Sequence, residues 1–248
     1  RNYWIWKEYD PSKDYMISAD VARGDGRDYS VFHVFNLAEM EIVAEYQGKV
    51  TPDVFSDMLS NAGREYGNCM LVVENNSVGY SVLEKLRERN YPNIYHSIKS
   101  THEYVDQIQA ESRSNAVAGF TTSSKTRPLV IAKMEEFVRN KLIKVYSSRL
   151  LNEMKTFIWN NGKPEAMRSY NDDLVMACSI GCWIRDTSLV ENQRNVEYKR
   201  ACLDSMILTN SRLDTTMPGQ NDYKRNSIFD KIQKTKSNYE QFPWLFKG

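Results

Sequence analysis

Residues 15–48 have the sequence YMISADVARGDGRDYSVFHVFNLAEMEIVAEYQG, which contains three apolar segments separated by short polar turns. The segments cover residues 15–21, 29–37 and 40–48, and each is rich in β-branched and aromatic residues, as strands are. Strands that follow one another through short connections pair in antiparallel order. This part of the chain therefore predicts a three-stranded antiparallel meander.

The segment after the meander predicts a change to parallel pairing. Thr51 and Pro52 favour the start of a helix that continues to about residue 66, and a short apolar run, CMLVVE, covers residues 69–74. A strand–helix–strand connection is right-handed and brings the new strand beside a parallel partner, for which the free edge of the first strand is available. The predicted fold class is α/β, a mixed sheet of an antiparallel meander and parallel strands flanked by helices.

The remaining segments continue this pattern as far as residue 186. We expect a helix around residues 82–86, a fifth strand at 94–98, a loop at 99–126, helices at 128–140 and 148–156, a strand at 142–146, a hairpin at 157–168, and an apolar helix at 172–184 that Asn171 caps. The predicted organisation is an N-terminal extension (1–14), a core (15–186) and a C-terminal helical or irregular extension (187–248).

The composition of the 248-residue chain is that of an ordinary globular protein, with 41% hydrophobic and 26% charged residues. Lys and Arg number 33 and Asp and Glu 32, so the net charge is +1 and a nucleic-acid contact must use a local basic patch. No apolar run approaches the roughly 18 residues of a membrane span, so we expect no membrane partner. Four cysteines are too few for a disulfide framework, which favours buried thiols and a cytoplasmic location.

Acidic side chains stand at the ends of the most apolar elements. Asp20 is near the end of the first strand, Glu74 ends the 69–74 run, and Asp172 and Asp173 open the apolar helix. Since the first and fourth strands are predicted to be parallel neighbours, Asp20 and Glu74 should lie roughly 5 Å apart, with Asp173 as a third carboxylate. Such carboxylates either share protons or hold a divalent cation, and oxygen ligands select Mg²⁺ or Mn²⁺. Taken singly, Asp172 also fits an ordinary acid at a helix N-terminus.

Four motifs follow one another in the chain. They are DVARGDGRDYS at residues 20–30, VENNSVG at 73–79, TRPL at 126–129 and YNDDLVMA at 170–177. In this order they resemble the nuclease domain of the large terminase subunit of tailed bacteriophages, the DNA-packaging motor, and most closely the myophage type. The resemblance extends from about residue 15 to residue 186, and the NDDLVMA stretch is its most specific part.

The resemblance implies a ribonuclease H-like fold and a Mg²⁺- or Mn²⁺-dependent endonuclease that cuts concatemeric viral DNA during genome packaging by a two-metal-ion mechanism. The family's metal-binding and catalytic acids match Asp20, Glu74 and Asp173; Asp172 matches a further metal ligand, and Asp28 an acid that supports the ligands. The implied partners are double-stranded DNA, the terminase ATPase domain, the small terminase subunit and the portal. The chain has no Gly-x-x-x-x-Gly-Lys-Ser/Thr loop, so we expect a nuclease domain without its ATPase domain.

Basic side chains near the acids are candidates for DNA contact, because Lys and Arg bind phosphates independently of sequence. They are Arg23, Arg27, Lys125, Arg127, Lys163 and Arg168. Each also fits an ordinary solvated surface charge. Tyr3, Trp4 and Trp6 could stack on bases, but we expect them to pack on the domain or to face the ATPase domain.

Two other functions stay open on the sequence alone. A Holliday-junction resolvase or an integrase relative would share the fold and the acids. A non-catalytic DNA-binding or motor-docking module would keep the fold without cutting. A Ser/His/Asp hydrolase is disfavoured, because none of the three histidines lies near a Gly-x-Ser-x-Gly turn.

Overall fold

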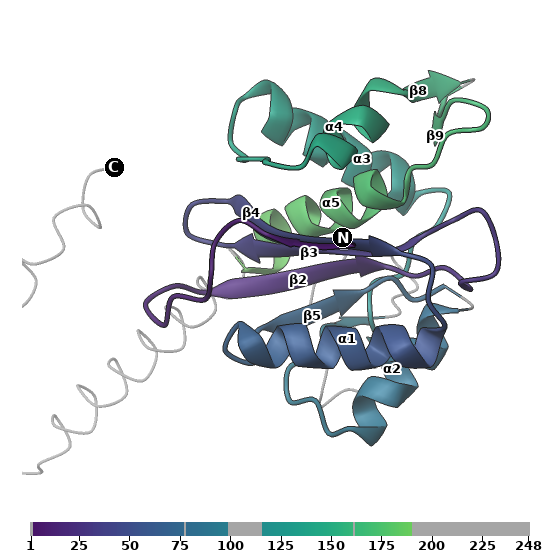
Figure 1. Ribbon diagram of the computed structural model, residues 1–248. Coiled ribbons are helices and arrows are strands. Elements are labelled where there is room, and N and C mark those ends of the chain that lie inside the picture. The colour runs from purple at the N-terminus through teal and green to yellow at the C-terminus, as the bar shows by residue number, and fades with distance from the viewer. Residues whose placement is uncertain (1, 77, 99–115, 161, 190–248) are drawn as a thin grey trace, which may run out of the picture. The chain divides into compact units, whose positions relative to one another are not determined.

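The computed structural model of the protein describes residues 2–76, 78–98, 116–160 and 162–189 (Figure 1). Its main sheet has the strand order β1-β4-β3-β2-β5. The strands are β1 (Tyr3–Ile5), β2 (Tyr15–Asp20), β3 (Ser30–Asn36), β4 (Glu41–Gly48) and β5 (Met70–Val73). The three central strands form the predicted antiparallel meander, and β5 pairs in parallel with β2, so the mixed α/β sheet is confirmed.

The N-terminal segment contributes an edge strand to this sheet. The sequence predicts an N-terminal extension at residues 1–14, whereas β1 pairs antiparallel with β4 and sets Tyr3 opposite Tyr46. Tyr3 packs on Phe32 with ring centroids 5.6 Å apart, and Trp6 packs on the core of the opposite face. The expectation that these aromatic residues pack on the domain is thus confirmed for Tyr3 and Trp6. A three-residue strand is too short to produce a recognisable alternation in the sequence.

Helix α1 (Pro52–Glu65) makes the predicted crossover from β4 to β5 and brings the carboxyl ends of β2 and β5 side by side. The outer edge of β5 is covered as well, since backbone hydrogen bonds join it to residues 93–95 and to Phe120. There β6 (His96–Ile98), which lies within the strand predicted at 94–98, pairs antiparallel with β7 (Ala116–Ala118) in a small sheet. Strand β7 lies within the segment 99–126, for which the sequence predicts a loop. Residues 99–115 of that loop lie outside the described residues.

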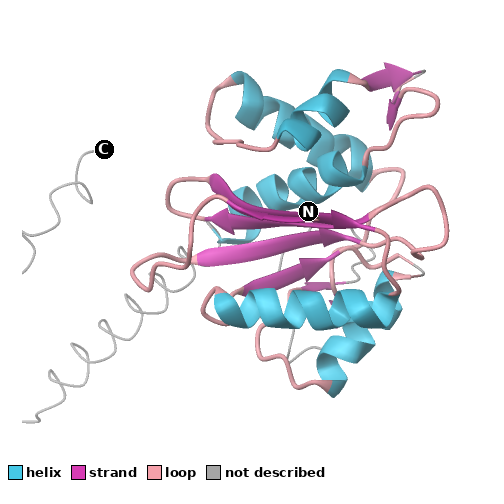
Figure 2. Ribbon diagram, in the orientation of Figure 1, coloured by secondary structure: helices cyan, strands magenta, loops and turns pink. Residues whose placement is uncertain are grey.

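Helices cover both faces of the main sheet (Figure 2). On one face, α1 and α2 (Gly79–Glu88) enclose a core that includes Ile17 and Phe32. On the other face, α5 (Asp173–Ile184) lies along the sheet beneath α3 (Thr126–Arg139), and their core includes Met16 and Phe35. Since side chains alternate along a strand, Asp20 lies on the same face as Met16, toward α5.

The remaining elements lie on the α5 side. They are α4 (Ser148–Lys155), the hairpin of β8 (Phe157–Asn160) and β9 (Lys163–Ala166), and a short π-helical turn, η2 (Arg185–Leu189). The hairpin is confirmed, although its turn residue Asn161 lies outside the described residues, as do residues 190–248 of the predicted C-terminal extension. The strand expected at residues 142–146 is wrong, because this segment makes only a single bridge to the sheet, between Lys144 and Glu41.

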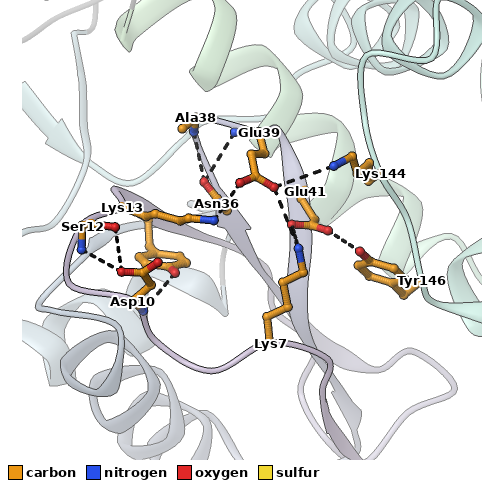
Figure 3. A network of polar contacts seen from close by, with 11 residues as sticks. Lys7, Asp10, Ser12, Lys13, Asn36, Ala38, Glu39, Glu41, Lys144 and Tyr146 are labelled. Carbon is orange, nitrogen blue, oxygen red and sulfur yellow. Dashed lines mark hydrogen bonds and ion pairs between the residues drawn. The ribbon is translucent and has the colours of Figure 1, made fainter.

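A charged network fastens the N-terminal segment to the end of the sheet opposite Asp20 (Figure 3). Glu41 is fully buried, and one of its carboxylate oxygens lies 2.6 Å from Lys7 Nζ while the other accepts a hydrogen bond from the Tyr146 hydroxyl. Glu39 beside it pairs with Lys13 at 2.7 Å. A buried carboxylate is tolerated when both oxygens have partners, so this network holds residue 7 and residue 146 on β4.

Two further expectations concern the environment of the chain. Within the described ranges, no helix combines the length and the apolar character needed to cross a bilayer. Cys69, Cys178 and Cys182 are free thiols buried in the cores, as predicted, and Cys202 lies outside the described residues.

Candidate active site

Asp20 ends β2 and Glu74 directly follows β5, so their carboxyl groups lie at the carboxyl ends of adjacent parallel strands, close enough to interact electrostatically. The ladder that aligns them pairs Ala19 with Val73, and the Glu74 N–H donates to the Ala19 carbonyl at 2.9 Å. Burial raises the pKa of Asp20, and the neighbouring Glu74 carboxylate raises it further. The predicted neighbourhood of these acids is confirmed, and their shared charge is of the kind that a cation would neutralise.

Glu74 is held in place by the turn that follows β5. The Asn76 amide donates to Glu74 Oε2 at 3.1 Å, while its oxygen accepts hydrogen bonds from the N–H groups of Val78 and Gly79 at the start of α2. On the other side, the N–H of Asn75 donates to the Phe120 carbonyl at 2.6 Å. The carboxylate therefore projects from a turn whose backbone is fixed on both sides.

We expect Gly79→Ala to lower the free energy of unfolding by about 3 kcal/mol and to lower any activity of the site. A Cβ at this position would lie 1.8 Å from the Glu74 carbonyl oxygen, so either the first turn of α2 or the acid-bearing turn must move. Urea unfolding monitored by circular dichroism would measure the change. Gly26→Ala is the matched control, since a Cβ there meets no atom within 4 Å; equal stability of the two variants would contradict the prediction.

Asp173 is the first residue of α5, and its buried carboxylate faces the turn between β2 and β3. Asp173 Oδ2 accepts hydrogen bonds from the Tyr29 N–H at 2.9 Å and from the Asn171 amide at 3.2 Å. Burial raises the pKa of Asp173 to about 6, partly offset by the Tyr29 N–H bond. The negative charge of Asp173 also raises the pKa of Asp20, so the third acid lies within electrostatic range of the pair.

Asp172 does not point to the same place as Asp173. Its carboxylate forms an ion pair with Arg127, and Arg127 Nε also donates to the Pro164 carbonyl at 3.0 Å. This contact ties the start of α5 to α3 and to the hairpin. Asp172, predicted as a metal ligand, and Arg127, predicted as a DNA contact, therefore have each other as partners in this structure.

The donors present suit a hard divalent cation. Asp20, Glu74 and Asp173 supply only carboxylate oxygens, the ligands that Mg²⁺ and Mn²⁺ prefer. The elevated pKa values of Asp20 and Asp173 reflect repulsion and burial that a cation would relieve. As the side chains stand, however, no three His, Cys, Asp or Glu residues in the described part of the chain form a group that could hold a metal ion. Asp20 and Glu74 are adjacent, and Asp173 is turned toward Tyr29 and Asn171.

Comparisons with known proteins identify the fold. No family model matches the sequence. Among solved structures, the chain is similar to the large terminase nuclease of the thermophilic phage G20c with bound magnesium, with a TM-score of 0.58 and 19% identity over 73% of this chain and 87% of that one. It is also similar to the large terminase nuclease domain of Thermus phage P74-26, with a TM-score of 0.55 and 20% identity over 73% and 84% of the two chains.

The chain has the fold of phage large terminase nuclease domains. The ribonuclease H-like class implied by the sequence motifs is thereby confirmed. At 19% and 20% identity the likeness concerns the fold, so the roles of individual residues must be argued from their own contacts.

The other predicted residues are exposed acidic and basic side chains. Asp28 is exposed and close enough to raise the pKa of Asp173. The side chains of Arg23, Arg27, Lys125, Lys163 and Arg168 are exposed. They come from the turn after β2, the start of α3 and the hairpin region. The Arg27 carbonyl accepts a hydrogen bond from the Asn171 amide at 3.1 Å, and the hairpin is joined to α3 through Pro164 and Arg127.

Three residues at the site have no counterpart in the predicted set. Asn76 and Asn171 orient Glu74 and Asp173, and both lie within the quoted motifs, so their position next to an acid is a usable signal. Glu153 on α4 accepts hydrogen bonds from two N–H groups of α5, and burial raises its pKa to about 8. Nothing in the local sequence around Glu153 indicates that contact.

Proposed function

We propose that this chain is a Mg²⁺- or Mn²⁺-dependent DNA endonuclease of viral genome packaging, a terminase large-subunit nuclease domain. The observation that carries the proposal is the adjacent pair Asp20 and Glu74 at the ends of parallel strands, with Asp173 within electrostatic range, on a fold shared with a terminase nuclease solved with magnesium. The proposed substrate is concatemeric double-stranded DNA. The proposed partners are the terminase ATPase domain, the small terminase subunit and the portal.

Asp20, Glu74 and Asp173 would hold the metal. When bound, a divalent ion supplies an activated water and neutralises charge on the phosphate, and two such ions can act on the attacking and leaving oxygens. The protein's own part is to present the ligands. Asn76 fixes the rotation of the Glu74 carboxylate, and the Tyr29 N–H with Asn171 fixes that of Asp173. Asp28 is proposed to act on the site electrostatically, because its negative charge raises the pKa of Asp173.

The exposed basic residues are proposed as phosphate contacts, which suits an enzyme that cuts without a fixed sequence. We expect Arg23→Gln combined with Lys125→Gln to weaken binding to linear duplex DNA at low salt and to reduce the slope of log K against log salt by about 1 to 2. Fluorescence anisotropy over a salt series would measure both. Arg139→Gln is the control, because this exposed arginine lies at the opposite end of α3 from Lys125. An unchanged slope would remove these side chains from the DNA surface.

Supercoiled plasmid tests the proposal. Purified protein should nick and linearise it with Mn²⁺ or Mg²⁺ and should leave it intact in EDTA. Binding without nicking under every metal condition would support a non-catalytic module. A strong preference for four-way junctions over linear duplex would support a resolvase. Either result would overturn the packaging-nuclease assignment.

A further inference from the structure

The two peptide groups that follow Asp173 are held by two side chains from other elements, Glu153 on α4 and His33 on β3. Glu153 Oε2 accepts hydrogen bonds from the N–H of Leu174 at 2.9 Å and of Val175 at 3.2 Å. On the carbonyl side, His33 Nε2 lies 3.1 Å from the Leu174 oxygen. A carbonyl oxygen can only accept, so His33 donates through Nε2. Leu174 is thus fixed at both ends of its backbone, one residue beyond the third acid.

The hydrogen bonds from Glu153 replace a cap by the residues just before α5. The first N–H groups of a helix have no partner inside the helix and usually bond to a side chain just before it. The N-cap residue of α5 is Asp172, which makes no side-chain cap hydrogen bond and pairs with Arg127 instead. The expectation that Asn171 caps this helix is wrong, because its amide donates to Asp173 and to the Arg27 carbonyl. The first turn of α5 is therefore capped from α4.

The capping residue is itself fastened to the sheet. Gln47 on β4 donates to Glu153 Oε1 at 3.2 Å. One turn earlier on α4, the Arg149 guanidinium holds Glu45 Oε1 through Nε and Nη2, each at 2.8 Å. Glu45 is fully buried, and its other oxygen lies 3.5 Å from His33 Nδ1 without a hydrogen bond between them. The contacts run from β4 through α4 to α5 and return through His33 on β3.

We propose that Glu153 is a positioning residue of the nuclease: through the Leu174 and Val175 N–H groups it sets where Asp173 stands relative to Asp20 and Glu74, and so sets the affinity of the site for a divalent cation. The inference rests on the proposed function. Residues that hold metal ligands in place typically change metal affinity or activity by 10–100-fold when removed. Asp173 is the only one of the three acids carried by a helix, so its placement depends most on how that helix is held.

Direct Mn²⁺ binding by metal-free protein tests this inference, followed by electron paramagnetic resonance of the free ion. We expect Glu153→Ala to raise the Mn²⁺ dissociation constant about tenfold or more, and the Mn²⁺ concentration for half-maximal nicking by the same factor. Glu153→Gln should stay within about threefold of wild type, since an amide oxygen can still accept both N–H groups. Asn152→Ala is the matched control on the exposed side of α4 and should not change the constant.

The possible results distinguish a failure of this inference from a failure of the proposed function. A Glu153→Ala protein that melts at a lower temperature yet binds Mn²⁺ like wild type would overturn the inference, leaving Glu153 a structural cap. Should Glu153→Ala not fold, Glu153→Asp keeps the charge but is one methylene too short for both N–H groups, and wild-type binding by that variant would overturn it as well. A wild-type protein whose Mn²⁺ binding is unaffected by Asp20→Asn, and which does not nick plasmid, would overturn the proposed function and this inference together.

Discussion

Asp20→Asn is expected to abolish metal-dependent nicking, by about a thousandfold or more, while leaving the metal-free protein at least as stable as wild type. The loss follows because asparagine retains the size of the side chain but not the charge that would hold the cation. The stability follows from the environment of Asp20, whose pKa is raised by burial and by the Glu74 carboxylate. Folding therefore opposes ionisation of this carboxyl, and an uncharged amide that can donate to Glu74 removes that cost.

Both halves of this result can be measured on one preparation. Plasmid nicking with Mn²⁺ gives the activity, and thermal unfolding in EDTA at pH 8 gives the stability. Asp25→Asn is the control, an exposed acid of the same turn, and should behave as wild type in both. Retention of more than about a tenth of the nicking rate would remove Asp20 from the site. A clearly lowered melting temperature would show that its charge stabilises the fold, contrary to the argument.

The metal-free protein is expected to lose about 5 kcal/mol of unfolding free energy between pH 5 and pH 8, and Mg²⁺ is expected to restore part of it at pH 8. Burial raises the pKa of Asp173 from 3.8 to about 6 and that of Glu153 from 4.5 to about 8. Between the ordinary and the raised values, the folded protein holds protons that the unfolded chain has released. Stability contributed by these groups is therefore lost as the pH rises through that window.

Magnesium should act in the opposite direction, because it binds ionised carboxylates and competes with protons. We expect 10 mM Mg²⁺ to raise the melting temperature by about 3 °C or more at pH 8 and by less than about 1 °C at pH 5.5. His33 opposes the trend, since burial lowers its pKa, but only below its ordinary value of 6.5. Asp20→Asn should abolish the Mg²⁺ effect. Equal Mg²⁺ shifts at both pH values, or stability that rises with pH in EDTA, would contradict the prediction.

Much of the sheet could be predicted from the sequence because its signals are local. Three β-rich segments with short connections leave few alternatives to a meander, and the apolar run that precedes Glu74 fits only a strand buried on both faces. The crossover rule then sets Glu74 beside Asp20, which the register of β2 and β5 bears out. Predicting which strands pair was therefore enough to predict that Asp20 and Glu74, which belong to separate motifs, are neighbours.

What escaped prediction depends on contacts between distant segments. Asp172 looks like a metal ligand or a helix N-terminal acid in the sequence, yet its partner is Arg127, brought to it by the packing of α3 on α5. Glu153 lies on a short helix with ordinary surface composition, and its role as a cap arises only because α4 packs against the first turn of α5. Side-chain contacts of this kind depend on how the helices and strands pack against one another, so the periodicity of the sequence does not indicate them.

The positions of the three acids along the chain also determine when the site can form during synthesis and folding. Asp20 and Glu74 meet as soon as β5 joins β2, a union between early parts of the chain. Asp173 arrives only with α5, whose apolar side chains complete the second core. A nascent or partly folded chain in which α5 has not yet packed would have Asp20 and Glu74 in place without Asp173. Under the proposed function, the three acids would therefore be brought together only in molecules that have finished folding.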